Sequence, residues 1–280
     1  MGINLLKEWI QMPITAGTHV LYTVRPGDTL SSIAYAFGTN VQALVEANAL
    51  YPPISDPNRI LPGQSLLIRL PGMSQQSSVL YQVKPGDSLF RIGNDFSLSI
   101  DMLAAMNHIQ QPGMIVVGQQ LYIPGFVYEV ETGDTLYTIA RRYGTSLGQL
   151  FRWNQRRPGL SPDAIYPGYR LVVPLPHSAN IVVFEPLPAS LVAPGQRLSG
   201  IARAFEAVIL YRIVDDAGRV VTSEKPITTT AGAPAYGAFE VALQFDQTPV
   251  HPTGTIMVYT RSANDNSVQD LVEIPYSHAF

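Results

Sequence analysis

The chain has 280 residues, of which 46% are hydrophobic, and a formal net charge of −3 at pH 7. This length allows two or more domains, and the composition is that of a folded protein rather than a disordered one. The small net charge, without a block of basic residues, disfavours nucleic acid and anionic membranes as main partners. Because the chain has no cysteine, disulfide bonds, thiolate metal sites and cysteine nucleophiles are excluded.

The N-terminal segment, residues 1–19, does not have the pattern of a secretory signal peptide. Lys7 and Glu8 stand where such a signal needs an apolar core. No stretch of the chain approaches the roughly 20 apolar residues of a membrane-spanning helix. We therefore expect a protein without a recognisable signal peptide and without a membrane span.

A short phrase recurs in the first two thirds of the chain. Its three copies are Pro26-Gly27-Asp28-Thr29-Leu30, Pro85-Gly86-Asp87-Ser88-Leu89 and Thr132-Gly133-Asp134-Thr135-Leu136. Each aspartate is followed twenty residues later by an asparagine, at Asn48, Asn107 and Asn154, and then by a second glycine, at Gly63, Gly118 and Gly168. A fixed internal register predicts an array of small modules, here over residues 20–69, 79–124 and 126–174.

The first copy predicts a strand, two helices and a second strand. Residues 21–24 are β-branched or aromatic, as is typical of a short strand. Asp28 is expected to cap a first helix, whose apolar residues recur with helical spacing between positions 30 and 37. Asn40 is expected to cap a second helix, and apolar residues alternate again at 66–68. The other copies repeat these elements, with second-helix caps at Ser99 and Ser146.

With these residues the chain resembles the LysM family of small βααβ carbohydrate-binding domains. The resemblance rests on the run Tyr22–Leu30, on Ile33-Ala34, on Asn48 and on Pro62-Gly63-Gln64. It implies paired strands with both helices on one side, and binding of N-acetylglucosamine-containing polymers such as peptidoglycan or chitin. It also places the sugar groove between two loops, one before the first helix and one between the second helix and the closing strand.

Carried over position by position, the resemblance assigns candidate glycan contacts to both loops of each copy. In the first loops these are Gly27, Asp28, Thr29 and Leu30; Gly86, Asp87, Ser88 and Leu89; and Gly133, Asp134, Thr135 and Leu136. In the second loops they are Asn58, Arg59, Ile60 and Leu61; Met114, Ile115 and Val116; and Ala164, Ile165 and Tyr166.

Each candidate position also has a structural explanation. The three aspartates fit helix caps better than ligand contacts, and the three asparagines are expected to hydrogen-bond to backbone in the adjacent loop. The isoleucines at 60, 115 and 165 could equally fill the small cores. The hydroxyls of Thr29, Ser88 and Thr135 are better ligand candidates, although each could instead assist the cap.

The spacing between copies predicts how the modules are joined. Residues 70–78 have the composition of a flexible linker, whereas little more than Pro124-Gly125 separates the second copy from the third. We therefore expect one tethered module beside a semi-rigid pair, with affinity recovered through effective concentration. The second loops differ in length and carry Tyr51-Pro52-Pro53 in copy one and Arg156-Arg157-Pro158 in copy three, so equal affinity in all copies is not expected.

After a short link at residues 175–179 the pattern changes to alternating apolar runs. Seven such runs, separated by turn signals that include Asp215-Asp216-Ala217-Gly218, predict a β-sandwich over residues 180–280. The segments 200–206 and 236–239 resemble the GerM-associated immunoglobulin-like domain of bacterial spore-germination proteins. That resemblance implies a protein- or envelope-interaction module in a spore-forming bacterium.

No region is left over for catalysis. The chain lacks a His-Glu-x-x-His metal helix, and its five histidines, at 19, 108, 177, 251 and 278, are scattered. Every segment already belongs to a small non-catalytic module. We therefore expect no enzymatic activity, no catalytic residue, no metal site and no cofactor.

The sequence thus predicts an α+β multidomain protein, with three βααβ LysM-like modules followed by an all-β immunoglobulin-like sandwich. The expected function is non-catalytic binding of peptidoglycan, spore cortex or chitin, which anchors the sandwich at the bacterial cell wall or spore envelope. Other spore or envelope proteins are expected partners of residues 180–280. One alternative is a self-assembling structural protein of the spore coat that uses the modules as scaffold, and another is a wall-piercing component of a phage or secretion machine.

Overall fold

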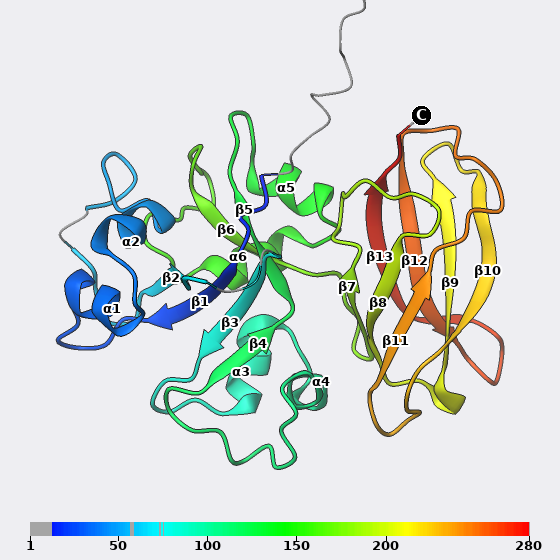
Figure 1. The fold of residues 1–280 in the computed structure, drawn as a ribbon, viewed down its shortest axis with the longest axis horizontal. Helices are drawn as coiled ribbons and strands as arrows, with labels where there is room; N and C mark the ends of the chain where they lie inside the picture. The colour runs from blue at the N-terminus through cyan, green and yellow to red at the C-terminus, as the bar shows by residue number, and fades with distance from the viewer. Residues whose placement is uncertain (1–12, 57–58, 73, 75, 280) are drawn as a thin grey trace, which may run out of the picture.

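The computed structural model describes residues 13–56, 59–72, 74 and 76–279. Three small modules of helices and strands lie side by side, and an all-β domain stands next to them (Figure 1). The predicted α+β multidomain class, with three βααβ modules followed by a sandwich, is confirmed. Most of the predicted N-terminal segment, residues 1–12, lies outside the described residues.

Each module folds as strand, helix, helix and strand. Module 1 consists of β1 (Thr18–Thr23), α1 (Leu30–Ala36), α2 (Val41–Ala47) and β2 (Ser65–Arg69). Module 2 consists of β3 (Ser78–Gln82), α3 (Leu89–Phe96), α4 (Ile100–Met106) and β4 (Gln120–Ile123). Module 3 consists of β5 (Gly125–Glu129), α5 (Leu136–Arg142), α6 (Leu147–Asn154) and β6 (Arg170–Pro174).

The first helix of each module is capped by the hydroxyl residue and not by the aspartate before it. Thr29 Oγ1 accepts a hydrogen bond from the Ser32 backbone N–H at 3.0 Å, and Ser88 and Thr135 occupy the same position in modules 2 and 3. The expectation that Asp28 caps α1 is therefore wrong by one residue, because the aspartates are engaged in the loop instead. The predicted second-helix caps Asn40, Ser99 and Ser146 are confirmed.

An asparagine at the same position of each repeat links the second helix of its module to the closing strand. Asn48 Nδ2 donates to the carbonyls of Leu44 and Leu67 at 2.9 and 2.8 Å, and its Oδ1 accepts from Leu67 N–H at 2.7 Å. Asn107 and Asn154 make the same three bonds in their modules. The partners are backbone groups, as expected, but they belong to the second helix and the closing strand rather than to the adjacent loop.

Module 1 is not tethered, because its first strand is part of module 2's sheet. β1 pairs in parallel with β3, from Thr18 opposite Ser78 to Leu21 opposite Tyr81. One sheet in the order β2-β1-β3-β4 therefore runs through both modules. The prediction of one tethered module beside a semi-rigid pair is wrong. The composition of residues 70–78 indicates a flexible connection, but it cannot reveal that the strands before and after this segment belong to one sheet.

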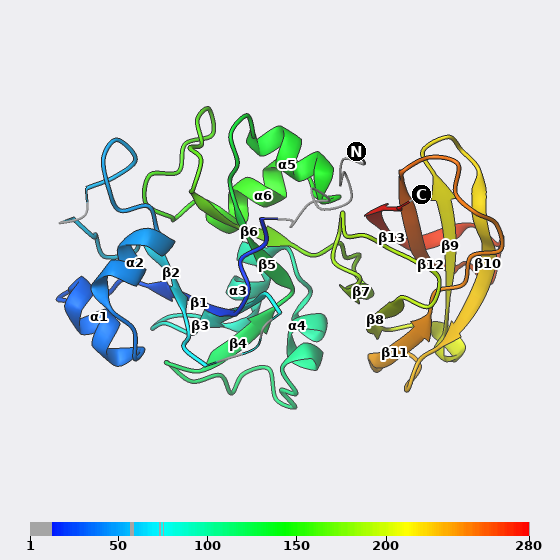
Figure 2. The same ribbon diagram turned by 45° about the horizontal axis from the view of Figure 1, so that its top comes forward.

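The closing strand of module 1, β2, explains why this module packs so closely against the others. Leu66, Leu67 and Ile68 are all fully buried, so β2 is covered on both faces and does not alternate. Leu66 and Ile68 pack in the core of module 1, whereas Leu67 joins a second core shared with modules 2 and 3. A strand that is apolar on both sides must be covered on both sides, and a second module supplies the cover. In Figure 2 the module strands lie close together in the middle, with α1 and α2 to the left of them and α5 above.

Large side chains at the end of α6 and just after it fix module 3 to the other two modules. Trp153 packs edge-on against Phe96 of module 2 at a centroid distance of 5.0 Å, and its Nε1–H donates to the Phe96 carbonyl at 3.0 Å. Arg157 is buried and donates to the Ala47 carbonyl of module 1 at 3.1 Å. The three modules therefore form one packed unit.

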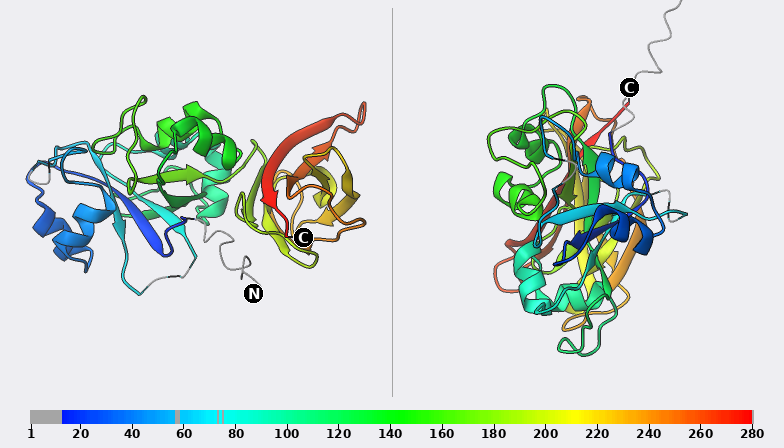
Figure 3. Two further views of the ribbon diagram at one scale, coloured as in Figure 1. Left: turned by 90° about the horizontal axis from the view of Figure 1, so that it is seen from above. Right: turned by 90° about the vertical axis from the view of Figure 1, so that its left-hand side faces the viewer.

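The C-terminal domain is a sandwich of two antiparallel sheets (Figure 3). Its strands are β7 (Ile181–Glu185), β8 (Arg197–Ala202), β9 (Val208–Asp215), β10 (Val220–Thr228), β11 (Gly237–Ala242), β12 (Thr253–Arg261) and β13 (Val268–Ser277). The sheets have the orders β10-β9-β12-β13 and β11-β8-β7, and their inner faces share one apolar core. All seven predicted strands and the turn after Asp215 are confirmed, the turn by a Gly218 N–H bond to the Asp215 carbonyl at 2.9 Å.

The link between the modules and the sandwich is held by packing and polar contacts. Leu175 is buried and its N–H donates to the Pro124 carbonyl at 2.8 Å. Arg203 of the sandwich forms an ion pair with Asp101 of α4 at 2.8 Å and lies over the ring of Tyr236. Among the described residues, no helix has the length and apolar character needed to cross a membrane.

His19 lies at the centre of the packed unit, in β1 between β2 and β3. Its side chain is fully buried. Burial first, and then the positive charges of Arg170, Arg69 and Arg157, lower the pKa of His19 to about 4, and a backbone contact with Gly17 offsets only part of this. The ring is therefore neutral in the folded protein at neutral pH.

Folding stability should fall as the pH drops from 6.5 towards 4, because in this range the unfolded chain protonates His19 and the folded protein does not. The loss grows to on the order of 3 kcal/mol at the lower end of the range and vanishes above the upper end. His19→Leu should flatten the dependence of the unfolding free energy on pH, measured by urea denaturation. His108→Asn, at an exposed histidine, is the matched control. Equal slopes in the wild type and His19→Leu would contradict this assignment.

Candidate functional site

The two loops expected to hold a sugar are neighbours in every module because the strand pairing continues into them. In module 1 the Val24 N–H donates to the Gln64 carbonyl at 2.8 Å, and the Gly63 N–H donates to the Val24 carbonyl at 2.9 Å. The same pair of bonds recurs in modules 2 and 3. The glycines that turn both loops, Gly27 and Gly63 in module 1, have φ of 87° and 92°, which side chains with a Cβ rarely adopt.

Each first loop is shaped by its aspartate. Asp28 Oδ2 accepts from the Tyr22 hydroxyl at 2.6 Å and from the Arg25 N–H at 2.7 Å. Asp87 and Asp134 hold the equivalent tyrosine and backbone N–H in modules 2 and 3. Burial first, and then the hydrogen bond to Asp28, raise the pKa of Tyr22 to about 12, so the phenol stays protonated and remains a donor. The aspartates therefore position the loop and are not free to contact a ligand with this oxygen.

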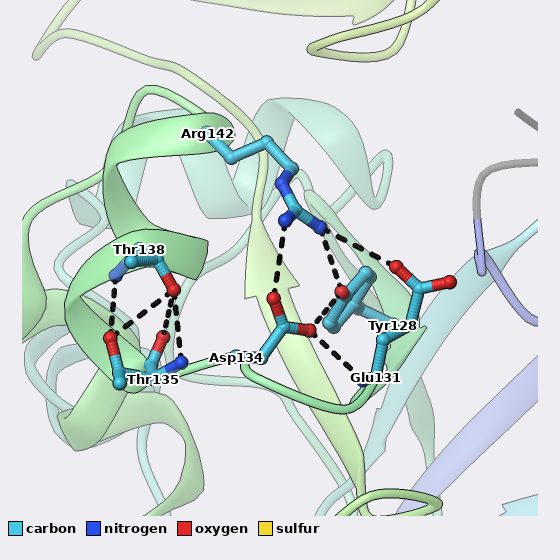
Figure 4. Close-up of polar contacts among 6 residues, drawn as sticks. All are labelled: Tyr128, Glu131, Asp134, Thr135, Thr138 and Arg142. Carbon is cyan, nitrogen blue, oxygen red and sulfur yellow. Dashed lines mark hydrogen bonds and ion pairs between the residues drawn. The ribbon is translucent and has the colours of Figure 1, made fainter.

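The loop aspartate of module 3 lies in the densest polar network (Figure 4). Arg142 from α5 donates to Asp134 Oδ1 at 3.1 Å and to the Tyr128 hydroxyl at 2.9 Å, and approaches Glu131 at 3.8 Å. The hydroxyl of Tyr128 in turn donates to Asp134. Module 2 has a simpler version, in which Lys84 pairs with Asp87 at 2.6 Å.

The structure places the sequence-predicted residues of the first loops in three environments. Gly27, Gly86 and Gly133 are exposed at the loop turns, and Thr29, Ser88 and Thr135 are exposed but used as caps. Leu30 is half-buried, whereas Leu89 and Leu136 are buried in the cores of their modules. Leu89 and Leu136 are therefore corrected from candidate contacts to core residues, because the first helix turns them inward.

The predicted residues of the second loops divide into an inner and an outer set. Ile60, Ile115 and Ile165 are half-buried and pack against the cores, while Arg59 and Ala164 are exposed. Asn58 lies outside the described residues. The exposed apolar side chains are Leu61, Met114, Val116 and Tyr166, with 44%, 69%, 65% and 39% of their surface accessible. Val117, which the sequence reading passed over, is exposed as well.

Module 2 has the most open pair of loops. Its second loop, residues 107–119, runs along the lower edge of the molecule in Figure 1 and carries Met114 and Val116. The longer second loops of modules 1 and 3 are used instead for contacts with other modules. Ser65 N–H donates to the Arg156 carbonyl at 2.9 Å, and Gly159 packs directly on Ile54. The modules therefore differ in how much of their grooves is free.

The two loops of a module together offer the kinds of groups that a binding site needs. The residues at the glycine turns, such as Gly27 and Gly63, are exposed, and the second loops carry exposed apolar side chains. Such groups match an N-acetyl amide and the apolar face of a sugar ring. Within the described ranges no three His, Cys, Asp or Glu side chains gather as a metal site would require.

One run of the chain, Gly144-Thr145-Ser146-Leu147-Gly148, has the Gly-x-Ser-x-Gly spacing of serine hydrolases. Here it joins α5 to α6 rather than a strand to a helix, and Ser146 Oγ accepts from the Gln149 N–H at 3.1 Å as the cap of α6. His177 lines the same polar pocket, but its ring nitrogens lie 2.8 Å from the Leu175 carbonyl and 3.2 Å from the Ser97 carbonyl. Ser146 is a helix cap and not an activated nucleophile.

The tyrosines that hold the loop aspartates are the functional positions that the sequence reading missed. They stand six residues before the aspartate in every copy, at Tyr22, Tyr81 and Tyr128. This repeated spacing is the feature of the sequence that could have identified them. It places the phenol at the end of the first strand, where it can reach back to the loop.

Asp134→Ala should lower the free energy of unfolding by about 2 kcal/mol, because it leaves the buried Tyr128 hydroxyl and the Glu131 N–H without their acceptor. Thr135→Ala, at the neighbouring position, removes only the cap and should cost about 1 kcal/mol. Urea denaturation of both variants measures the difference. A larger loss for Thr135→Ala would show that the cap, and not the aspartate, organises the loop.

Two family models match the chain. The model of the LysM domain matches residues 22–69, 81–124 and 128–174, and the model described as an immunoglobulin-like domain of bacterial spore germination matches residues 180–267. Neither is the model of a catalytic domain. The matched ranges coincide with the three βααβ modules and with most of the sandwich.

Several known proteins are similar over part of this chain. An autolysin of Enterococcus faecalis is 29% identical over 201 residues, which are 59% of this chain and 26% of that protein. The putative sporulation-specific glycosylase YdhD of Bacillus subtilis is 39% identical over 95 residues, which are 34% of this chain and 22% of that protein. The secreted LysM effector ECP6 of Passalora fulva is 28% identical, over 56% of this chain and 78% of that protein.

Among solved structures, the spore cortex-lytic enzyme SleL of Bacillus cereus matches with 33% identity and a TM-score of 0.27, over 39% of this chain and 23% of that one. The chain thus covers about a quarter of the length of SleL and of the two bacterial relatives. The repeats, their shared geometry and both family models agree. The chain is a LysM protein, with three LysM domains followed by an immunoglobulin-like domain of the bacterial spore germination type.

Proposed function

We propose that this protein binds N-acetylglucosamine-containing glycan of the bacterial cell wall or spore cortex, without cleaving it, and holds its immunoglobulin-like domain at that surface. The observation that carries the proposal is the pair of adjacent loops in each LysM module, with exposed residues at the glycine turns and exposed apolar side chains in the second loop. The names of the relatives, an autolysin and a sporulation-specific glycosylase among them, support a wall or spore setting.

Module 2 is the principal binding site in this proposal. Its second loop is free of contacts that cover Met114 and Val116, and these side chains gain most from burial against a sugar face. A single small groove binds weakly. Because the three modules form one packed unit, a long glycan that reaches more than one groove binds the second without a further loss of translational freedom.

The chemistry of the loops disfavours catalysis. Hydrolysis of a glycosidic bond needs two carboxyl groups across a cleft, one of them held protonated. Each first loop instead has an aspartate that is engaged by a tyrosine hydroxyl and by backbone, as in Asp28. The first loop of module 3 adds Glu131, but Arg142 contacts both carboxylates of this loop, Asp134 at 3.1 Å and Glu131 at 3.8 Å. Ser146 serves as a helix cap. The described residues therefore offer a holding site without a reacting pair.

A sedimentation experiment tests the proposal. Purified protein is mixed with insoluble peptidoglycan, spore cortex and chitin, and the bound fraction is measured with and without soluble N-acetylglucosamine oligomers. Binding that the oligomers compete away supports a glycan anchor. Failure to bind any of the three polymers, together with ordered homo-oligomers in light scattering, would replace the proposal with a structural, self-assembling role.

The double variant Met114→Ser with Val116→Ser should weaken binding to the preferred polymer by about tenfold, which corresponds to about 1.4 kcal/mol of lost apolar contact. Because both side chains are exposed, the melting temperature should stay unchanged. Val250→Ser, at an exposed valine of the sandwich, is the matched control and should bind as the wild type does. Unchanged affinity in the double variant would move the principal site to another module.

A further inference from the structure

A cleft of about 490 Å³ lies between modules 1 and 2 and borders the first loop of module 1. Module 1 lines it with residues of β1, of the first loop and of α1, among them Tyr22, Arg25 and Phe37. Module 2 contributes Gln82 at the end of β3 and Gln120 at the start of β4. The cleft exists only because β1 pairs with β3, so a single LysM domain does not have it.

Arg25 is the cation that lines this cleft, and it lacks the ion pair that its counterpart in module 2 has. Lys84, at the same position of module 2, pairs with Asp87 at 2.6 Å. Module 3 has Glu131 at this position, and Arg142 from α5 pairs with the loop aspartate Asp134 at 3.1 Å. Within the described parts of the chain no carboxylate forms an ion pair with the Arg25 guanidinium, which lies 5.7 Å from the centre of the Tyr22 ring. Its Nε is buried without a hydrogen-bond partner.

Asp28 does not neutralise this guanidinium. Its Oδ2 accepts from the Tyr22 hydroxyl and from the backbone N–H of Arg25, and no ion pair with the Arg25 side chain forms. A buried donor without an acceptor costs about 1–3 kcal/mol. A bound anion would supply the acceptor, and the planar fork of a guanidinium fits the two oxygens of a carboxylate.

The opposite wall adds amide donors. The side chains of Gln82 and Gln120 have no hydrogen-bond partner among the described residues, and both line the cleft. The rest of the lining is mostly apolar and includes Ile33, Ala36, Phe37 and Leu70. Ser32 and Asp28 also line the cleft, and Asp28 Oδ2 is already engaged by the Tyr22 hydroxyl and the Arg25 N–H. The cleft thus combines one unpaired guanidinium, two free amides and an apolar floor, which together suit a carboxylate carried on a short organic substituent.

We propose that the cleft binds a carboxylate carried by the peptidoglycan strand, and that it makes the protein prefer peptidoglycan over neutral chitin. This inference rests on the proposed function. Gln82 and Gln120 flank the loops of module 2, and Arg25 belongs to the first loop of module 1, so the cleft adjoins the grooves of both modules. A glycan seated in either groove carries its substituents to the cleft.

The test compares oligomers of one length that differ in their acidic substituents. Isothermal titration measures the affinity for a neutral N-acetylglucosamine oligomer, for a muramyl-containing oligomer with a free lactyl carboxylate, and for one with a peptide stem. The wild type should bind at least one acidic oligomer about tenfold more tightly than the neutral one, with a preference that falls as salt rises. Which acidic oligomer gains identifies the lactyl group or the stem as the source of the carboxylate.

Arg25→Gln should abolish this preference and leave the affinity for the neutral oligomer unchanged. Arg25→Lys should retain part of the preference, and Gln120→Glu should remove it by placing an internal carboxylate near Arg25. Arg141→Gln, at an exposed arginine of α5, is the matched control. Thermal unfolding checks that each variant is folded.

The outcomes separate the two proposals. If the wild type binds neutral and acidic oligomers equally, or if Arg25→Gln weakens both alike, the carboxylate site is wrong while glycan binding stands. If the wild type binds neither kind of oligomer, the proposed function fails and the carboxylate site fails with it.

Discussion

The parallel pairing of β1 with β3 is the constraint on which the rest of the structure depends. It joins the strands of two modules in one sheet. It also brings Leu67 of β2 into a core shared with Trp153 and Val172 of module 3. β2 is apolar on both faces, so module 1 on its own would leave one face of this strand in water. The inter-module cleft and the position of His19 follow from this close packing, whereas each groove is formed within its own module.

The elements within each module could be predicted from the sequence because local rules decide them. Helical spacing, glycine turns and the caps Asn40, Ser99 and Ser146 act over a few residues. Asp28 was misassigned because aspartate and threonine are both good caps, and the distant Tyr22 hydroxyl decides between them. How the modules join could not be predicted in the same way, since pairing depends on residues sixty positions apart. The unbroken apolar run at 66–68 was the one local sign of it.

The candidate site was predicted in outline and corrected in detail. Family resemblance located the two loops of each module, and the structure brings them together through the bonds between Val24 and the second loop. Resemblance could not tell that Leu89 and Leu136 turn inward, because burial depends on the exact start of the helix. It also could not reveal the cleft beside the unpaired Arg25, since residues of two modules line that cleft.

Shared packing also sets the order in which the chain can mature during synthesis. β1 and β2, which the two helices of module 1 separate, can pair as soon as Arg69 has been made, but the core around Leu21 and Leu67 also includes Trp153 and Val172, which follow much later. Roughly the first 170 residues therefore reach their final form together rather than one repeat at a time, unlike modules joined by loose linkers. A chain cut after its first repeat would leave an apolar sheet face exposed to water and prone to association.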